Sequence, residues 1–320
     1  MGLIHAVETG SGQRARRTVL PDPVGKMGAI MKRMKLILAA LLCLLSAAIL
    51  LSLLLSTHAL SVSKYRVECR TLKLPLRIVQ LSDLHNHEFG KDNARLIRKV
   101  RQQEPDLIVL TGDMLNQDED RTDVDECLVQ ELVKIAPVYA SNGNHERQFE
   151  QRYQADLQTL YRDAGARLLE REWVDLEIKG QALRIGGAFG YCLPGDILEN
   201  SEAEREMTSF LEQFQDTDKV KLLLCHMPFA WIVTRSLDYW DVDIVFAGHA
   251  HGGQVRFPWI GGLYAPDQNW FPGECAGLYP SKDGDSTMVL SRGLGGSGMK
   301  LPRFNNIPEI VVLDLVPAQA

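Results

Sequence analysis

The stretch Val245–Val255, VFAGHAHGGQV, places His249 and His251 one residue apart at the end of a short apolar run. One glycine precedes the pair and two follow it, and glycine permits tight backbone turns that β-branched residues cannot follow. In an extended segment, residues i and i+2 point the same way. The pattern therefore predicts a loop that delivers two imidazole rings to one place.

The other histidines follow the same pattern. Every histidine after residue 60 comes just past an apolar run that we predict to be a strand, and none lies in a predicted helix. They are His85, His87, His145, His226, His249 and His251. Asp83, Asp113 and Asn144 occupy the same kind of position. A single loop histidine is usually a hydrogen-bonded side chain with no further role, but six in equivalent positions indicate a shared site.

Short β-branched runs alternate with longer amphipathic segments through the body of the chain. The predicted strands cover residues 76–83, 105–113, 138–146, 182–190, 220–228, 242–251 and 308–316. The predicted helices cover residues 91–103, 123–135, 151–165 and 201–214. This alternation predicts an α/β layered domain. Because open α/β sheets bind ligands outside the carboxyl ends of their strands, the polar residues named above are expected to line a site.

The N-terminal part of the chain has a different composition. Leu36–Ser63 contains no Asp, Glu, Lys or Arg, and about 20 apolar residues suffice to cross a bilayer as a helix. The segment shows no polar face of helical period, which a buried core helix would have. It is longer than the apolar region of a usual signal peptide, so we predict a retained anchor.

Charges beside this segment indicate its orientation. Lys32, Arg33 and Lys35 crowd its N-terminal flank, which favours that end in the cytoplasm and the rest of the chain on the extracytoplasmic side. The expected organisation is a basic cytoplasmic segment over residues 1–35, a transmembrane anchor over 36–60, a tether over 61–72 and one α/β domain over 73–317. Translation from Met31 instead of Met1 remains an alternative.

The composition of the body excludes two classes of protein. After residue 60 the chain carries 28 Lys and Arg against 39 Asp and Glu, a net charge of −11. Broad binding to nucleic-acid phosphates needs clustered Lys and Arg, so no nucleic-acid partner is expected. The cysteines are odd in number after the anchor and lack CxxC spacing, so we expect buried thiols rather than a disulfide framework or a zinc ribbon.

Five short blocks carry a resemblance to a known family. DLH (83–85), GD (112–113), GNHE (143–146), His226 and GHAH (248–251) follow one another in an order that resembles the calcineurin-like metallophosphoesterases. The later segments GGQV, SRGLG and PRFNNIPEIVVLDL resemble the membrane-anchored branch with bacterial phosphodiesterases and UDP-diacylglucosamine pyrophosphatases. The resemblance implies a four-layer αββα sandwich after one transmembrane helix.

The resemblance also implies a set of metal ligands. Asp83, His85 and His251 would bind a first divalent ion, and Asn144, His226 and His249 a second, with Asp113 bridging both. Imidazole with carboxylate suits transition metals, so the expected cofactor is a pair of Mn ions, with Fe, Zn or Ni as alternatives. His145 would act on the substrate together with Asp113, Glu146 would orient its loop, and His87 has no place in the motif.

The implied activity is hydrolysis of a phosphodiester or pyrophosphate bond by a hydroxide held between the two ions. His145 would donate a proton to the leaving oxygen. The expected substrate is a phosphoester or pyrophosphate, with a lipid-linked nucleotide sugar such as UDP-2,3-diacylglucosamine as the specific candidate. The alternative function is a catalytically silent metal-binding scaffold at the membrane.

Two further features allow more than one interpretation. The glycine-rich stretch SRGLGGSG (291–298) is either a loop that presents Arg292 to a substrate phosphate or a plain surface loop, and Arg303 is a second candidate of that kind. The aromatic residues Trp259, Tyr264, Trp270 and Phe271 either wall a substrate pocket or plug the space under a long loop.

Overall fold

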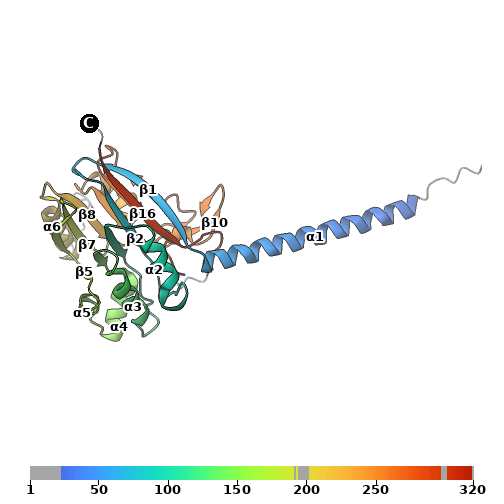
Figure 1. The fold of residues 1–320 in the computed structure, drawn as a ribbon. Coiled ribbons are helices and arrows are strands. Elements are labelled where there is room, and N and C mark those ends of the chain that lie inside the picture. The colour runs from blue at the N-terminus through green and yellow to red at the C-terminus, as the bar shows by residue number, and fades with distance from the viewer. Residues whose placement is uncertain (1–22, 191, 194–201, 297–300, 319–320) are drawn as a thin grey trace, which may run out of the picture. The chain divides into compact units, whose positions relative to one another are not determined.

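The computed structural model describes residues 23–190, 192–193, 202–296 and 301–318. Contacts divide the chain into two compact units, Met1–Leu50 and Leu51–Ala320. Most of the expected basic N-terminal segment, residues 1–22, lies outside the described residues. Figure 1 shows the helices and strands of the described part.

One long helix begins the described chain. Helix α1 covers Pro23–His58, and its segment Ile30–His58 is long and apolar enough to cross a membrane, with a mean hydropathy of 2.8 over its most apolar window. None of that window is buried, whereas the core helix of a soluble protein would be mostly buried. A signal sequence meets the same criteria, so the retained anchor over residues 36–60 stays a prediction.

The first sheet has the strand order β1-β16-β2-β3-β4-β5. Its strands are β1 (Ser61–Cys69), β16 (Glu309–Pro317), β2 (Leu76–Leu81), β3 (Leu107–Thr111), β4 (Val138–Ser141) and β5 (Arg167–Leu169). Strand β16 runs parallel to β1 and antiparallel to β2, and the strands from β2 to β5 are parallel. The first and last strands of the body therefore pair with each other.

The second sheet has the strand order β14-β15-β9-β8-β7-β6. Its strands are β14 (Gly277–Pro280), β15 (Thr287–Leu290), β9 (Ile244–Ala247), β8 (Val220–Cys225), β7 (Gln181–Ala188) and β6 (Glu172–Ile178). The four central strands are parallel and both edge strands are antiparallel to their neighbours. Parallel central strands bring their carboxyl ends, with the residues that follow them, to one edge of each sheet.

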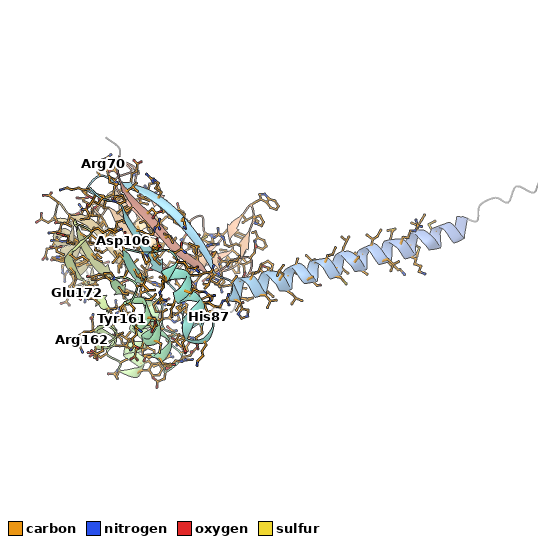
Figure 2. All side chains as sticks on the ribbon, viewed as in Figure 1. Arg70, His87, Asp106, Tyr161, Arg162 and Glu172 are labelled. Carbon is orange, nitrogen blue, oxygen red and sulfur yellow. The ribbon has the colours of Figure 1, made fainter. Side chains whose placement is uncertain are left out.

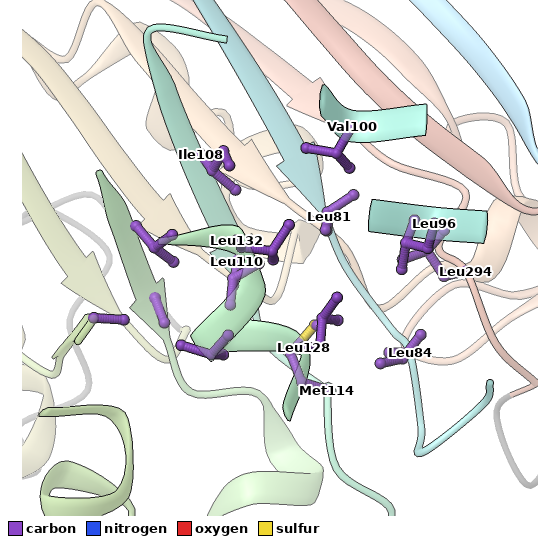
Figure 3. Close-up of a cluster of buried hydrophobic side chains, with 14 of the residues drawn as sticks. Leu81, Leu84, Leu96, Val100, Ile108, Leu110, Met114, Leu128, Leu132 and Leu294 are labelled. Carbon is purple, nitrogen blue, oxygen red and sulfur yellow. The ribbon is translucent and has the colours of Figure 1, made fainter. Parts of the chain in front are cut away.

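Three hydrophobic clusters show how the layers pack. The inner faces of both sheets meet in one cluster that contains Ile78, Leu222 and Leu313. On the outer face of the first sheet lie α2 (Ala94–Arg101), α3 (Asp123–Leu132) and α5 (Leu157–Asp163). Figure 3 shows part of this cluster, to which the helices contribute Leu96 and Leu128 and the sheet contributes Leu81 and Leu110.

Helices α6 (Glu202–Gln215) and α7 (Phe229–Ile232) pack in the same way against the second sheet. The order of layers is therefore helix, sheet, sheet, helix, which confirms the αββα sandwich.

Two expectations about local structure are wrong. Residues 61–69, expected in a tether, form β1, because the paired strand β16 supplies the backbone partners that a tether lacks. The single helix expected over residues 151–165 is divided into α4 (Asn144–Tyr153) and α5, because Gln154 adopts a left-handed conformation and Asp156 caps the second helix through the Thr159 amide. The start of α5 is thereby fixed by its own cap.

Candidate metal centre

The predicted ligands converge at the carboxyl ends of strands from both sheets. Asp83 and His85 follow β2 and Asp113 follows β3, whereas His226 follows β8. His249 and His251 follow β9. Two groups of side chains each bring their ligand atoms within 4.8 Å of one another. The first is Asp83, His85, Asp113 and His251, and the second is Asp113, His226 and His249.

Asp113 belongs to both groups, as a residue that bridges two ions must. Its Oδ2 lies 3.2 Å from Nε2 of His226 in the second group and 3.8 Å from Nε2 of His85 in the first. Asn144 begins α4 beside it, with a buried Oδ1 that has no hydrogen-bond partner. The side-chain placement thus suits the predicted division of ligands, and the assignment of each ligand to one ion stays a prediction.

The backbone reaches this arrangement by a route that the sequence pattern did not predict. Asp83, His85, Asp113, His249 and His251 all have φ between 47° and 66°, so the segments that carry them are left-handed rather than extended. We expected an extended backbone to bring His249 and His251 to one place, and that reason is wrong. The two histidines nevertheless belong to adjacent ligand groups. Such conformations cost on the order of 1–3 kcal/mol each and concentrate at functional sites.

The buried polar atoms of the site are suited to cations. The site encloses carboxylate and imidazole side chains, and several of their possible ligand atoms make no hydrogen bond among the described residues. These atoms include Oδ2 of Asp83, both ring nitrogens of His85, Nε2 of His226 and Nδ1 of His251. A buried polar atom without a partner costs about 1–3 kcal/mol, and a divalent ion removes that cost by coordination. The residues present therefore fit a pair of divalent ions.

Outer contacts orient two of the imidazoles. Nδ1 of His226 lies 2.7 Å from the carbonyl oxygen of Thr111, so the neutral ring holds its proton on Nδ1. The lone pair of Nε2, which lies 3.2 Å from Oδ2 of Asp113, is then free to bind a metal ion. Nε2 of His249 lies 3.2 Å from Oδ2 of Asp267, a close contact between the ring and a carboxylate. That contact leaves Nδ1 of His249 for a metal ion.

Glu146 holds the neighbouring loops without facing a ligand position. Its buried carboxylate accepts hydrogen bonds from the amides of Asp113, Leu115 and Gly143, at 2.7, 2.9 and 2.7 Å. Burial, followed by the charge of Asp113, raises the pKa of Glu146 to about 7. These contacts bear out the expectation that Glu146 orients its loop.

His145 lies in the first turn of α4, which corrects the prediction that no histidine is helical. Its amide donates to Oδ1 of Asp113 at 2.8 Å, and its ring centroid lies 4.4 Å from that of His85. The amide of Gln117 donates to its Nδ1 at 3.2 Å, so the neutral ring carries its proton on Nε2. His145 can therefore offer an N–H group at the edge of the site.

His87 lies outside both groups. Its ring packs edge-on against Phe89 with a centroid separation of 4.6 Å, and it is labelled in Figure 2. The expectation that it is no ligand agrees with this placement.

Both candidate arginines are already engaged. Arg292 pairs with the buried Glu309 at 3.0 Å and donates to Oγ of Ser61. Arg303 donates to four backbone carbonyl groups, among them those of Gly293 and Gly295. These arginines fix the loop behind Asp83, whose carbonyl oxygen accepts from the Gly295 amide at 2.6 Å. A phosphate contact through Arg292 stays a prediction, and residues 297–298 of its loop lie outside the described residues.

The sequence matches the calcineurin-like phosphoesterase family over residues 76–253, more than half of the chain and all seven candidate ligands. The chain belongs to this family. It is accordingly a metal-dependent phosphoric ester hydrolase, of a family that uses two divalent ions.

Two relatives and one solved structure are similar to the chain. The chain is 27% identical to phosphodiesterase YaeI of Escherichia coli (strain K12), over 76% of this chain and 83% of that protein. It is 25% identical to UDP-2,3-diacylglucosamine pyrophosphatase LpxG of Chlamydia trachomatis, over 74% of this chain and 83% of that protein. A 5'-nucleotidase precursor from Thermus thermophilus aligns with a TM-score of 0.45 at 14% identity, over 69% of this chain and 49% of that one.

Sequence reasoning missed three contributors to the site. Asp267 and the carbonyl group of Thr111 orient ligands from positions with no motif of their own. Arg147, one turn after Asn144, lines a hollow of about 700 Å³ beside that ligand. Of the three, only Arg147 could have been predicted from the sequence. It lies three residues after Asn144, and residues three apart are neighbours on the surface of a helix.

Proposed function

We propose that this protein is a membrane-anchored phosphoesterase that hydrolyses a phosphodiester or pyrophosphate bond, with a lipid-linked substrate such as UDP-2,3-diacylglucosamine. The observation that carries the proposal is the pair of buried ligand groups that share Asp113. When bound there, two divalent ions supply the charge that holds the oxygens of a phosphoryl group and lowers the pKa of a water molecule.

The charges of the site favour an anionic substrate. The ligand set offers two carboxylates, Asp83 and Asp113, against the four positive charges of two divalent ions. Asn144 contributes a neutral amide where a third carboxylate would cancel more of that charge. A phosphate group is therefore attracted although the body of the chain is acidic.

His145 performs the proton transfer in this proposal. Nδ1 of His145 accepts a hydrogen bond from the Gln117 amide, so Nε2 is the ring atom that carries the N–H group. The ring lies beside that of His85, at the edge of the site. The ring acts as an acid in its protonated form: it donates the Nε2 proton to the leaving oxygen and returns to the neutral form that accepts from the Gln117 amide. Such a proton transfer accelerates hydrolysis by roughly 10²–10⁴.

We infer that Mn²⁺ is the resident ion, with Fe, Zn and Ni as the competing assignments. Imidazole, carboxylate and amide ligands suit these metals, whereas calcium prefers shells of oxygen alone. Metal analysis of the protein purified from its own cells, without added metal, tests this. Two manganese ions per chain are expected, and stoichiometric zinc or nickel would overturn the assignment.

The substrate test uses the full chain in detergent micelles. Metal-stripped protein with and without added Mn²⁺ is given a bis-aryl phosphate, an aryl phosphate monoester and UDP-2,3-diacylglucosamine. Metal-dependent cleavage of the diester and of the pyrophosphate, with little cleavage of the monoester, is the expected result. A folded, metal-loaded sample that cleaves none of the three would favour the scaffold function.

The extracytoplasmic location is tested with a natural cysteine. Cys127 lies exposed on α3, whereas Cys69, Cys192, Cys225 and Cys275 are buried and Cys43 lies within α1. A membrane-impermeant maleimide should label Cys127 in intact spheroplasts, and Cys127→Ser should abolish that labelling. Labelling only after lysis would place the catalytic unit in the cytoplasm.

A further inference from the structure

Hydrophobic side chains gather in an exposed segment just after the metal-ligand loop. Outside α1, the described residues expose eight large hydrophobic side chains, and five of them fall between residues 257 and 271. These five, called the aromatic patch from here on, are Phe257, Trp259, Ile260, Trp270 and Phe271. Trp259 is 94% exposed and the last three are each 60% exposed. The patch therefore neither plugs a loop nor walls an enclosed pocket, which excludes the plug interpretation for these residues.

Short hairpins present the patch. Strands β10 (Arg256–Phe257) and β11 (Gly261–Gly262) pair with each other, as do β12 (Tyr264–Ala265) and β13 (Asn269–Trp270). Trp259 and Ile260 form the tip of the first hairpin, which is closed by the bond from the Ile260 amide to the Phe257 carbonyl. An aromatic side chain that can bury about 150–250 Å² is thus held in water on an ordered tip.

Hydrogen bonds join this segment to the end of α1. Within the unit Leu51–Ala320, the Asn305 amide donates to Oγ of Ser52 at 2.9 Å, and Asn305 Nδ2 donates to the Arg256 carbonyl at 3.1 Å. The Asn306 amide donates to Oγ of Ser56 at 3.0 Å. One asparagine therefore connects the last turns of α1 with the residue that precedes Phe257, and Figure 1 shows β10 near that end of α1.

The position of Ser52 along α1 sets the depth of the patch. If the bilayer core begins at Leu36, about 20 helical residues bring its far face to the region of Leu55. Ser52 lies less than one turn before that point. The first hairpin, which Asn305 bonds through the Arg256 carbonyl, then lies near the lipid headgroups, where tryptophan is the preferred residue.

We propose that the aromatic patch inserts into the headgroup region of the lipid bilayer. This inference rests on the membrane anchor of the proposed function. The same segment carries Asp267, whose carboxylate contacts the metal ligand His249. Insertion would hold the metal centre at a set distance from the bilayer surface, where a lipid-linked phosphoester presents its phosphate.

The tryptophans make the proposal measurable. Two of the five tryptophans of the chain lie in the patch, and α1 has none. Trp231 and Trp240 are buried, and Trp173 lies on the distant edge strand β6 against Phe210. Quenching of tryptophan emission by lipids brominated on their acyl chains therefore reports on the patch.

The experiment compares nanodiscs of brominated and ordinary lipid that contain the full chain. Emission should be weaker in brominated lipid for the wild-type chain and for the control Trp173→Phe. Trp259→Ser and Trp270→Ser should each remove part of this quenching, and the double substitution should remove all of it. Equal emission from the wild-type chain in both lipids, or quenching that survives the double substitution, would overturn the proposal.

A second measurement on the same nanodiscs separates this proposal from the proposed function. Neither tryptophan belongs to the metal centre, so both substitutions should leave Mn²⁺-dependent cleavage of a soluble bis-aryl phosphate unchanged. Quenching without any cleavage would sustain the patch and overturn the catalytic proposal. Cleavage without quenching would overturn the patch alone, and self-association through the patch with unquenched tryptophans would assign it to a second copy of the chain.

Discussion

Proton positions at the metal centre follow from single backbone contacts. The Gln117 amide determines which nitrogen of His145 carries the proton, and the Thr111 carbonyl does the same for His226. The two rings are thereby held in opposite tautomers, with a proton on Nε2 in His145 and a lone pair on Nε2 in His226. Neighbouring histidines of one chemical type can therefore serve as proton donor and as ligand.

Replacing His145 by Ala should separate catalysis from metal binding. The variant should keep two ions per chain, because no ligand atom is removed, and lose roughly 10²–10⁴ in turnover on a diester with a poor leaving group. Steady-state kinetics with metal analysis checks both. His87→Ala, which removes a histidine outside both groups, is the matched control and should change neither quantity. Unchanged turnover in His145→Ala would remove this residue from the mechanism.

Asp267 should act through His249 as a positioning residue. Oδ2 of Asp267 lies 3.2 Å from Nε2 of His249, a contact that leaves Nδ1 of His249 for the metal ion. Asp267→Asn removes the charge from this contact and so weakens it. Loss of such an outer partner typically costs roughly 10–100-fold in metal affinity. Competition with a fluorescent chelator should show this loss for one of the two ions, whereas Asp120→Asn on the surface should bind both as the wild type does. Equal affinities in the two variants would leave Asp267 without a role at the metal.

At the scale of elements, most of the site depends on where strands end and helices begin. Helix α4 starts at Asn144, so its first turn carries the predicted ligand Asn144, the proposed proton donor His145 and the carboxylate of Glu146, which accepts from the Gly143 amide. Glycine at position 143 is required by this close approach, because an added Cβ would lie 2.2 Å from Oδ1 of Asp113. The junction between β4 and α4 is therefore a compact structural unit of the site.

Helix α3 carries a buried carboxylate that should make stability depend on pH. Burial raises the pKa of Asp125 to about 7, and both of its oxygens lack a hydrogen-bond partner among the described residues. Tyr161 of α5, labelled in Figure 2, is its polar neighbour. Between the unfolded pKa near 3.8 and the folded value, the unfolded chain loses this proton while the folded chain keeps it, so stability falls as pH rises.

Replacing Asp125 by Asn should remove this dependence. Relative to the wild type, the variant should gain unfolding free energy as pH rises from about 4 to about 7, by up to about 1.4 kcal/mol per pH unit. Above about pH 7 the difference between the two proteins should stay constant. Urea titrations at several pH values check it. A difference that does not vary with pH would show that Asp125 titrates alike in both states.

At the scale of the whole molecule, the metal centre lies where two sheets meet, so ion binding and folding are coupled. The first group is supplied by the loops after β2, β3 and β9, and the second by those after β3, β8 and β9. Ions at these positions connect the two sheets at their carboxyl ends. Without them, buried carboxylates and imidazoles remain with unpaired atoms.

Removing the ions should therefore lower the stability of the catalytic unit. Free metal at about 1,000 times its dissociation constant contributes about 4 kcal/mol per ion to the folded state. Thermal unfolding of the full chain in detergent, before and after dialysis against a chelator, should show a lower midpoint that added Mn²⁺ restores. An unchanged midpoint in a sample shown to be metal-free would mean that the site is stable without its ions.

Several features were predictable because they depend on neighbours along the chain. Alternating apolar runs indicated the strands, and the polar residues at their ends indicated the ligands, because in parallel sheets those ends share an edge. The anchor-like segment was equally evident from composition. Gln154, by contrast, interrupts an amphipathic pattern that continues on both sides, so the periodicity concealed the break between α4 and α5.

The sequence by itself determined the layers of the fold and predicted the ligand side chains, since both follow from local pattern and strand order. Only the tertiary structure decided that residues 61–69 pair with the last strand, that Asp267 contacts His249, and that Trp259 is exposed on a hairpin bonded to Asn305. The first two features depend on contacts between segments far apart in the chain, and the third depends on which side chains no other segment covers. The physical reason is that the periodicity of apolar residues indicates only whether a side chain is buried or exposed. Which residues meet at the strand ends is set by how the two sheets pack.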